Sequence, residues 1–420
     1  MDSLLTPANR AWQEKAREVA ERHVRPVAAK YDRLQEYPWE VKAKLAEAGL
    51  MGVWIPKEYG GAGGGVLDLC LVVEEISRAC GGMGVMYAVN ALGSFPIILA
   101  GTEAQKRRYL PEIASGRKLI AFGLSERQAG SDAGGLQTKA VAQPDGTLLV
   151  DGDKKWTTNG GAADFYTVFA VSDPESRSRR ISGVIAEKGD AGFEIGRAED
   201  KMGIRCVPVV ELHFRGCRLP ADRVLGGERG YGFKHAMQTL DCARPGVAAQ
   251  AVGLAQGALE YALVYTAGRQ QFGAPLSSFQ MVQQMLADMS TKIEAARQLV
   301  HAAARAIDAG GGNAVTRMAA QAKLFATDVA MEVTTNAVQL LGGYGYMRDY
   351  PVEKYMRDAK ITQIYEGTNQ VQRLVVARAL LKEALNLDHL KAYMPLPDHP
   401  NTALDRARAA QPVSAAAPRA

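Results

Sequence analysis

Glu366 is the residue whose type and neighbours are best suited to proton chemistry in this sequence. It lies in the segment Ile361 to Arg373, between the aromatic Tyr365 and Gly367. A glycine has no Cβ, so a flat ligand can approach closely at this point. A carboxyl held against apolar surface has a raised pKa, which makes it a useful base near neutral pH. The alternative is a glutamate that only interacts with the dipole of a following helix.

The residues after Glu366 predict that helix. Thr368 and Asn369 are residue types that cap a helix start. The positions that share one helical face come next, and they are Val371, Leu374, Val375 and Arg378. Glu366 is therefore expected on a tight connection directly before a helix.

Length and composition limit the classes of protein. The chain has 420 residues, which exceeds what one hydrophobic core usually serves, so two or three regions are expected. A 47% apolar content and a net charge of +5 are ordinary for a soluble protein and argue against a nucleic-acid partner. The five cysteines are widely spaced and odd in number, and the six histidines form no ligand pattern. We expect no disulfide framework, no metal site and a reducing compartment.

No leader and no apolar run long enough to cross a bilayer is recognised, so no membrane association is expected. A cytoplasmic bacterial protein is the simplest interpretation. A processed protein of the mitochondrial matrix would look the same if the source is eukaryotic.

The periodicity of apolar residues divides the chain into four parts. Residues 1–121 have helical spacing, and residues 122–235 contain short β-like runs with a hairpin signal at Asp145-Gly146. Residues 236–392 return to long helical stripes typical of a four-helix bundle, whose fourth helix follows Glu366. Residues 393–420 are rich in Pro and Ala and are expected to be disordered. The predicted fold class is α+β, with a helical N-terminal domain, a central antiparallel β-domain and a C-terminal bundle.

The run RDAKITQIYEGTNQVQR around Glu366 resembles the C-terminal signature of the acyl-CoA dehydrogenases. From about residue 5 to about residue 385 the chain is most similar to the short-chain, butyryl-CoA type. The resemblance implies FAD as cofactor and a role in fatty-acid β-oxidation. It implies that Glu366 takes the α-proton of an acyl-CoA while flavin N5 takes the β-hydride, giving a trans-2-enoyl-CoA. It also implies an electron-transferring flavoprotein as electron acceptor and a homotetramer.

Two segments resemble the parts of the family that hold the flavin ring. They are FGLSERQAGS, residues 122–131, and WTTNG, residues 156–160. The family usually has proline after the glutamate of the first segment, where this chain has Arg127 and Gln128. Ser131 is implied to contact the CoA chain as well as the cofactor. The implied flavin contacts are Phe122, Leu124, Ser125, Ser131, Trp156 and Thr158.

A second group of residues resembles the family's site for the FAD pyrophosphate and adenine of a neighbouring subunit. Arginine suits a pyrophosphate because its planar fork makes charge-assisted bonds. Without the resemblance, a surface arginine and a glycine-rich helix end explain the same residues equally well. This group consists of Arg269, Phe272, Phe279, Gln280, Gln339, Gly342 and Gly343, and the resemblance adds Thr368 and Gln370.

The substrate contacts are implied for Ser131, Asp241, Arg244 and Gly367. Some relatives carry their base at the position of Ala243, which cannot take a proton. Glu366 is then the only base that the pattern offers.

Other functions stay open at this stage. An acyl-CoA oxidase or flavin monooxygenase has the same fold, and a silent acyl-CoA-binding protein is a further alternative. A glutaryl-type dehydrogenase would need an arginine at the acyl end of the pocket, for which Arg78 is the nearest candidate. Acyl length depends on residues 85–95, where Tyr87 and Phe95 either shorten the pocket or pack in the core.

Overall fold

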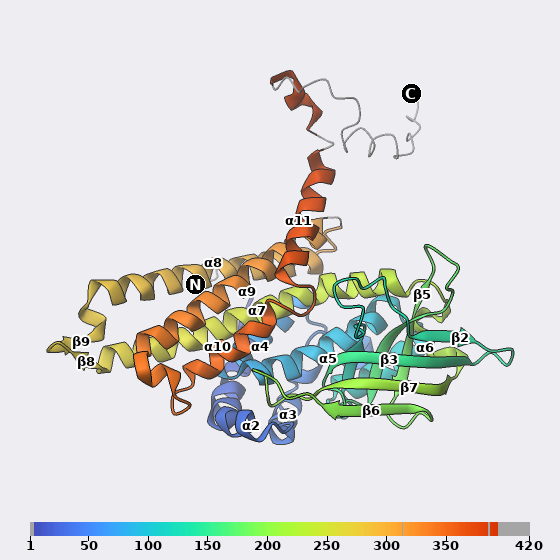
Figure 1. The fold of residues 1–420 in the computed structure, drawn as a ribbon, viewed down its shortest axis with the longest axis horizontal. Helices are drawn as coiled ribbons and strands as arrows, with labels where there is room; N and C mark the ends of the chain where they lie inside the picture. Colours follow the sequence, from blue (N-terminus) through green and yellow to red (C-terminus); the bar gives the residue numbers. More distant parts are fainter. Residues whose placement is uncertain (1–3, 313, 385–386, 394–420) are drawn as a thin grey trace.

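The computed structural model describes residues 4–312, 314–384 and 387–393, and it has two regions of long helices joined to a sheet (Figure 1). The tail predicted to be disordered, residues 393–420, lies outside the described residues except for its first residue. The α+β fold class is confirmed, with a helical N-terminal region, a central β-domain and a C-terminal helical region.

Six helices form the N-terminal region. In the sequence, Thr102 followed by Gln105 three positions later predicts a capping box at the start of a helix. The box is present, because the Thr102 hydroxyl accepts from the Gln105 backbone and the Gln105 side chain accepts from the Thr102 backbone. The helices are α1 (Pro7–Val19), α2 (Ala28–Leu34), α3 (Trp39–Glu47), α4 (Val66–Ala79), α5 (Gly81–Ala100) and α6 (Glu103–Ala114).

The central sheet has the order β1-β4-β2-β3-β7-β6, and β5 pairs with β4. The predicted hairpin is confirmed: β2 and β3 are antiparallel around Gly146, whose φ is 83°. The strands are β1 (Ile120–Gly123), β2 (Lys139–Ala142), β3 (Leu148–Thr158), β4 (Phe165–Val171), β5 (Ile181–Glu187), β6 (Phe193–Ala198) and β7 (Val209–Leu219).

The sheet departs from the prediction in two places. It is not purely antiparallel, because β1 runs parallel to β4 with Ile120 opposite Phe165. The β2–β3 hairpin separates these two strands in sequence and serves as the crossover that a parallel pair requires. The sequence also missed β6, an edge strand that carries Glu194 and Arg197 and lacks a clear alternation of burial.

The C-terminal helices are α7 (Gly232–Gly268), α8 (Gln280–Asp308), α9 (Ala314–Leu341), α10 (Val352–Thr362) and α11 (Asn369–Ala384). The short strands β8 (Gln270–Gln271) and β9 (Ala274–Pro275) form a hairpin between α7 and α8. Helix α10 packs against α7 and α9, and α11 packs against α9 and then projects from the body (Figure 1).

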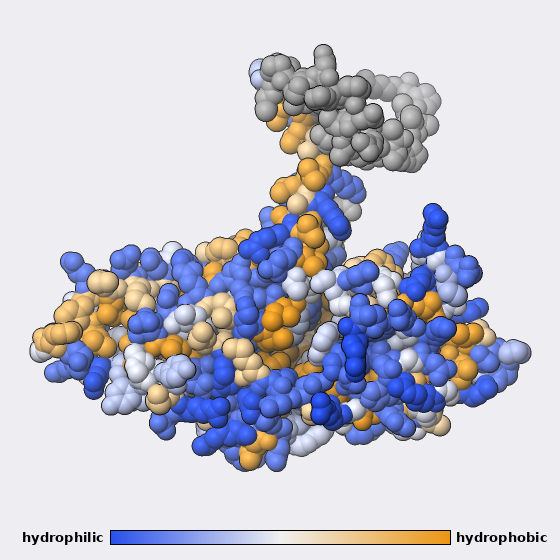
Figure 2. Space-filling model, viewed as in Figure 1, coloured by the Kyte–Doolittle hydropathy of each residue, from blue (hydrophilic) through white to orange (hydrophobic). Residues whose placement is uncertain are grey.

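The apolar face of α11 is largely exposed. Leu374 is 55% exposed and Leu381 is 64% exposed, and Figure 2 shows apolar surface along this helix where it leaves the body. The helical period identified an amphipathic helix correctly, but periodicity does not say which surface the apolar face will contact.

Helices α5 and α7 are long and apolar enough to cross a membrane by length and composition, contrary to the expectation from the sequence. In each, 72% of the most apolar window is buried inside the protein. This burial is what the core helices of a globular fold require.

Three hydrogen bonds fasten the β-domain to the helices around the candidate site. Asn159 Nδ2 at the end of β3 donates to Met86 O of α5 at 3.0 Å. Thr167 Oγ1 of β4 donates to Gly93 O of the same helix at 3.1 Å. The Ile204 N–H donates to Asp358 Oδ1 of α10 at 2.6 Å. The β-domain is thereby held against α5 and against α10, the helix that precedes the Glu366 turn.

Candidate active site

Glu366 lies in the turn between α10 and α11. Glu366 has φ 52° and Gly367 has φ 94°, so two successive residues adopt the left-handed region. Such backbone persists only where the surroundings enforce it. Gln372 contributes, because its Nε2 donates to Glu366 O at 3.3 Å and to Gly367 O at 2.9 Å. The Val371 N–H donates to Thr368 Oγ1 at 3.2 Å, which confirms the predicted cap.

The Glu366 carboxylate borders a narrow, largely apolar cavity. Its Oε2 atom is buried and has no hydrogen-bond partner among the residues that the structure describes. An unpaired buried polar atom in a native protein calls for a functional explanation. The cavity is lined by Leu69, Val85, Ala88, Val89, Ala91, Leu92, Phe95, Ala243, Gly246, Val247, Gln250, Tyr365 and Glu366.

Several sequence expectations can be checked against this lining. Residues of the stretch 85–95 do face the cavity, including Phe95. Tyr87 instead packs in the core, where its hydroxyl donates to Leu50 O at 2.8 Å. Gln250, which the sequence analysis did not identify, borders the cavity and accepts a hydrogen bond from the Tyr365 hydroxyl.

Burial raises the pKa of Glu366 to about 7, against the opposing effect of the Arg244 and Lys323 charges. A base with this pKa is in the useful range at neutral pH. Arg244 is buried and donates to Asp241 Oδ1 at 2.7 Å. Asp241 Oδ2 also accepts from Thr316 Oγ1 at 2.6 Å. Asp241 and Arg244, two of the implied substrate contacts, therefore form an ion pair on α7 close to Glu366.

Lys323 is a second residue that the sequence analysis missed. It is fully buried on α9, and its Nζ donates to Gly367 O at 2.9 Å and to Asn369 Oδ1 at 2.8 Å. Burial lowers its pKa to about 7. The available signal was a lysine among the alanines of an otherwise apolar helical stripe, flanked by Ala319, Ala320 and Ala326.

The two segments predicted to hold the flavin ring lie side by side. The Lys155 N–H of β3 donates to Ser125 O of the first segment at 2.8 Å. Trp156 is 53% exposed and has φ 58°, so a large aromatic ring is presented to ligand by strained backbone. Thr157 Oγ1 is buried without a hydrogen-bond partner.

These features fit a flat aromatic cofactor with polar edges. Ser125 and Thr158 are half-buried at the junction of the two segments, and Ser131 is exposed. Phe122 and Leu124 are half-buried against a small hydrophobic cluster and support the segment from behind. The pair Arg127 and Gln128 does not disturb it, because Arg127 pairs outward with Glu211 at 2.9 Å.

The residues predicted for the pyrophosphate and adenine gather at the other end of the molecule, around the β8–β9 hairpin (Figure 1). Arg269, Gln339, Gly342 and Gly343 line one cleft there. Phe272 at the hairpin tip is 96% exposed and contacts Phe279 edge-on. Gly246 and Arg269 are separated by 23 residues along α7, about 35 Å at 1.5 Å per residue. One chain therefore does not bring the two predicted halves of the FAD site together.

The remaining predicted cofactor residues lie at the start of α11 and α8. Thr368 caps α11, and Gln370 and Gln280 are exposed.

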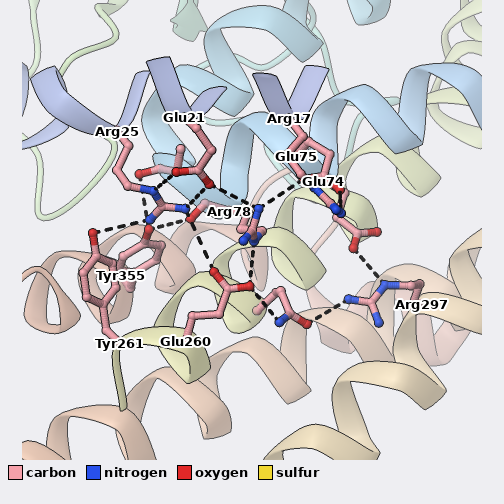
Figure 3. A network of polar contacts seen from close by, with 12 residues as sticks. Arg17, Glu21, Arg25, Glu74, Glu75, Arg78, Glu260, Tyr261, Arg297 and Tyr355 are labelled. Atoms are coloured by element: carbon pink, nitrogen blue, oxygen red, sulfur yellow. Dashed lines mark hydrogen bonds and ion pairs between the residues drawn. The ribbon is translucent and has the colours of Figure 1, made fainter. Parts of the chain in front are cut away.

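Arg78 is not near the acyl end of the cavity lining. It belongs to a polar network that joins the N-terminal helices to α7, α8 and α10 (Figure 3). Its Nε donates to Glu260 at 2.7 Å, and its Nη1 lies 3.2 Å from Glu21 and 3.5 Å from Glu75. These carboxylates compensate the charge of Arg78, and no Lys or Arg lines the cavity.

Sequence profiles of the three acyl-CoA dehydrogenase domains match this chain. The N-terminal domain matches residues 6–117, the middle domain residues 121–217 and the C-terminal domain residues 230–381. The chain therefore belongs to the acyl-CoA dehydrogenase family and is an oxidoreductase whose cofactor is FAD.

Individual relatives are similar over most of their length. The probable acyl-CoA dehydrogenase fadE25 of Mycobacterium leprae is 49% identical over 366 residues, 87% of this chain and 93% of that protein. Butyryl-CoA dehydrogenase from Megasphaera elsdenii has a TM-score of 0.88 at 46% identity, covering 91% of this chain and 100% of that chain. A chain in the structure of the electron transferring flavoprotein of Acidaminococcus fermentans has a TM-score of 0.88 at 48% identity, with the same coverage.

Proposed function

We propose that this protein dehydrogenates a short, apolar acyl-CoA thioester between Cα and Cβ, with Glu366 as the base that removes the α-proton. The observation that carries the proposal is the unpartnered Glu366 Oε2 at the apolar cavity, with a pKa of about 7. A carboxylate with a free lone pair beside an apolar chain is suited to abstract a weakly acidic C–H proton.

The residues around Glu366 orient and protect this step. The turn fixes the carboxylate through Lys323 and Gln372, and the apolar lining excludes water from the reacting carbons. The Glu366 backbone N–H donates to the thioester oxygen and stabilises the charge that develops there. FAD supplies the acceptor for the β-hydride when it is bound.

The cavity favours a short acyl group without a second charge. Its lining contains no Lys or Arg that could neutralise a distal carboxylate, which argues against the glutaryl-type alternative. The similar protein from Megasphaera elsdenii is a butyryl-CoA dehydrogenase, which supports an acyl chain of similar length.

The proposal extends to the assembly and its electron acceptor. The residues for the FAD pyrophosphate lie at the far end of the chain from Trp156, so a complete site needs a second copy, consistent with a homotetramer. The similarity to a chain in an electron transferring flavoprotein structure supports such a flavoprotein as electron acceptor. All five cysteines are free thiols, which supports a cytoplasmic location.

An anaerobic titration with a panel of acyl-CoAs tests the reaction and names the substrate. Short-chain acyl-CoAs should bleach the flavin absorption band of the wild-type protein, whereas glutaryl-CoA should not. Glu366→Gln should bind FAD and acyl-CoA but lose at least about 1,000-fold in the rate of bleaching, because the amide cannot accept the proton. Near-normal bleaching by this variant would refute the base assignment.

Glu353→Gln is the matched control, because Glu353 lies on the preceding helix and pairs with Arg357 outside the cavity lining. Its bleaching rate should stay within a few-fold of the wild type. Oxygen consumption with peroxide release during aerobic turnover would instead favour the oxidase alternative.

A further inference from the structure

Lys323 makes two hydrogen bonds and both go to the segment that carries Glu366. The acceptors are the carbonyl oxygen of Gly367 and the side-chain oxygen of Asn369. Asn369 is held in turn, because its Nδ2 donates to Thr327 Oγ1 at 2.8 Å and to Asp328 Oδ1 at 2.7 Å. Side chains from one turn of α9 therefore hydrogen-bond to the start of α11 and to the left-handed turn before it.

The charge of Lys323 is unusual among the buried lysines of the described residues. Lys154 lies 2.6 Å from Glu126, and Lys354 lies 2.5 Å from Asp358. Lys323 has no ion pair with a carboxylate within the described part of the chain, and both of its acceptors are neutral oxygens. A buried ammonium without a paired carboxylate is costly to keep, so its retention needs a reason.

The other charges around the turn are already compensated. On α7, Arg244 pairs with Asp241 at 2.7 Å. On α9 and α11, Asp328 pairs with Arg373 at 3.0 Å. On α10, Lys354 pairs with Asp358, and Tyr365 beside the base is neutral because burial keeps its pKa well above the ordinary value. Two positive charges act on Glu366, and within the described part of the chain Arg244 has a carboxylate partner of its own whereas Lys323 has none.

We propose that Lys323 is a positioning residue for the base: its ammonium holds the Glu366–Gly367 turn and favours the ionised form of Glu366. This inference rests on the proposed role of Glu366. The pKa of Glu366 about 7 is then the balance of burial, which raises it, and of the Arg244 and Lys323 charges, which lower it. Without the Lys323 charge, Glu366 should remain protonated to a higher pH.

The pH dependence of anaerobic flavin reduction by a short acyl-CoA tests this inference in the holoenzyme. In the Lys323→Met variant, the pH at which the rate rises should increase by roughly one unit or more, which gives at least about a tenfold loss of rate at pH 6. Lys323→Arg keeps the charge and should keep the wild-type profile. A Lys323→Met profile with a lower plateau but an unmoved rise would overturn the proposal, because it would mean that Lys323 is only structural.

Two further variants separate charge from packing. Asn369→Asp places a carboxylate on Lys323 without removing the lysine, so the rise should again move to higher pH even if Lys323→Met does not fold. Thr327→Val removes a hydroxyl that accepts from Asn369 Nδ2 and donates to Lys323 O, and it removes no charge, so the rise of the rate should stay at the wild-type pH. An unmoved rise in Asn369→Asp would also overturn the proposal. A failure of the base assignment itself is recognised separately, because Glu366→Gln would then still bleach.

Discussion

Lys154 and Lys323 are both fully buried, and each donates to the main chain of a segment that the proposed reaction needs. Lys154 Nζ lies 3.3 Å from Leu124 O in the first flavin segment, and Lys323 Nζ lies 2.9 Å from Gly367 O beside the base. They differ in their charge partner. Lys154 also donates to the Glu126 carboxylate at 2.6 Å, whereas Lys323 donates only to neutral oxygens.

This difference shows that a buried lysine can serve two purposes, because it can either complete an ion pair or act on a nearby carboxyl group. Burial lowers the pKa of Lys154 to about 8 even with Glu126 attached, and that of Lys323 to about 7. Burial would raise the pKa of Glu126, but the Lys154 charge and hydrogen bonds to the Thr138 and Gln137 backbone lower it overall. The charges of Lys154 and Glu126 therefore compensate each other, and the pair serves to hold the conformation of the first flavin segment. The charge of Lys323 remains available to Glu366.

Removing the Glu126 carboxylate from the Lys154–Glu126 pair should have the largest effect on the free energy of unfolding. Glu126→Gln keeps one side-chain oxygen, so one of the Gln137 and Thr138 N–H groups retains its acceptor, and it leaves Lys154 buried without a carboxylate. We expect a loss of about 3 kcal/mol in the free energy of unfolding at pH 7, measured from urea midpoints. Arg127→Gln removes an exposed pair from the same loop and should cost less than about 0.5 kcal/mol. Equal effects of the two changes would mean that Lys154 does not depend on Glu126.

In the turn that carries Glu366, replacing the glutamate by glutamine should instead stabilise the protein. The pKa of Glu366 is about 7 in the folded chain against an ordinary 4.5, so the folded state binds the proton more tightly than the unfolded state. The stability that this provides is complete below pH 4.5 and is lost as the pH rises through 7. Ionised Glu366 therefore costs up to about 3 kcal/mol at pH 8.

Glu366→Gln removes that cost. Its urea midpoint should exceed that of the wild type at pH 8, and the gain should shrink toward zero as the pH falls to 5. A gain of the same size at both pH values would show that packing and not ionisation is responsible. A loss at pH 8 would contradict the assignment of Glu366 as a carboxylate whose burial outweighs the nearby positive charges.

Features set by neighbours in sequence were predicted well. The cap at Thr368, the box at Thr102 and the turn at Gly146 each depend on residues a few positions apart. The roles assigned to Glu366 and to the flavin segments stay predictions that the experiments above test. The structure does place Ser125 and Lys155 in contact, which the order of the motifs alone did not require.

Features set by distant contacts were missed. Lys323 binds Gly367, 44 positions away, and nothing in its own helix says which loop it will meet. The parallel pairing of β1 with β4 depends on the β2–β3 hairpin between them. The helical period of α11 does not give its direction, and its Leu374 and Leu381 are largely exposed in the structure. Local propensity is consistent with several tertiary arrangements in each case.

The smallest test uses one threonine from each region. Thr157 Oγ1 in the second flavin segment is buried without a partner, whereas Thr327 Oγ1 accepts from Asn369 Nδ2 at 2.8 Å. Thr157→Val should therefore raise the stability of the FAD-free protein by up to about 1 kcal/mol, and Thr327→Val should lower it by about 1 kcal/mol. Both are measured from urea midpoints. If the Thr157 hydroxyl is kept for FAD, Thr157→Val should also release flavin more readily on dilution than Thr327→Val. Destabilisation by both changes with equal flavin retention would mean that the Thr157 hydroxyl, like that of Thr327, is hydrogen-bonded within the protein itself.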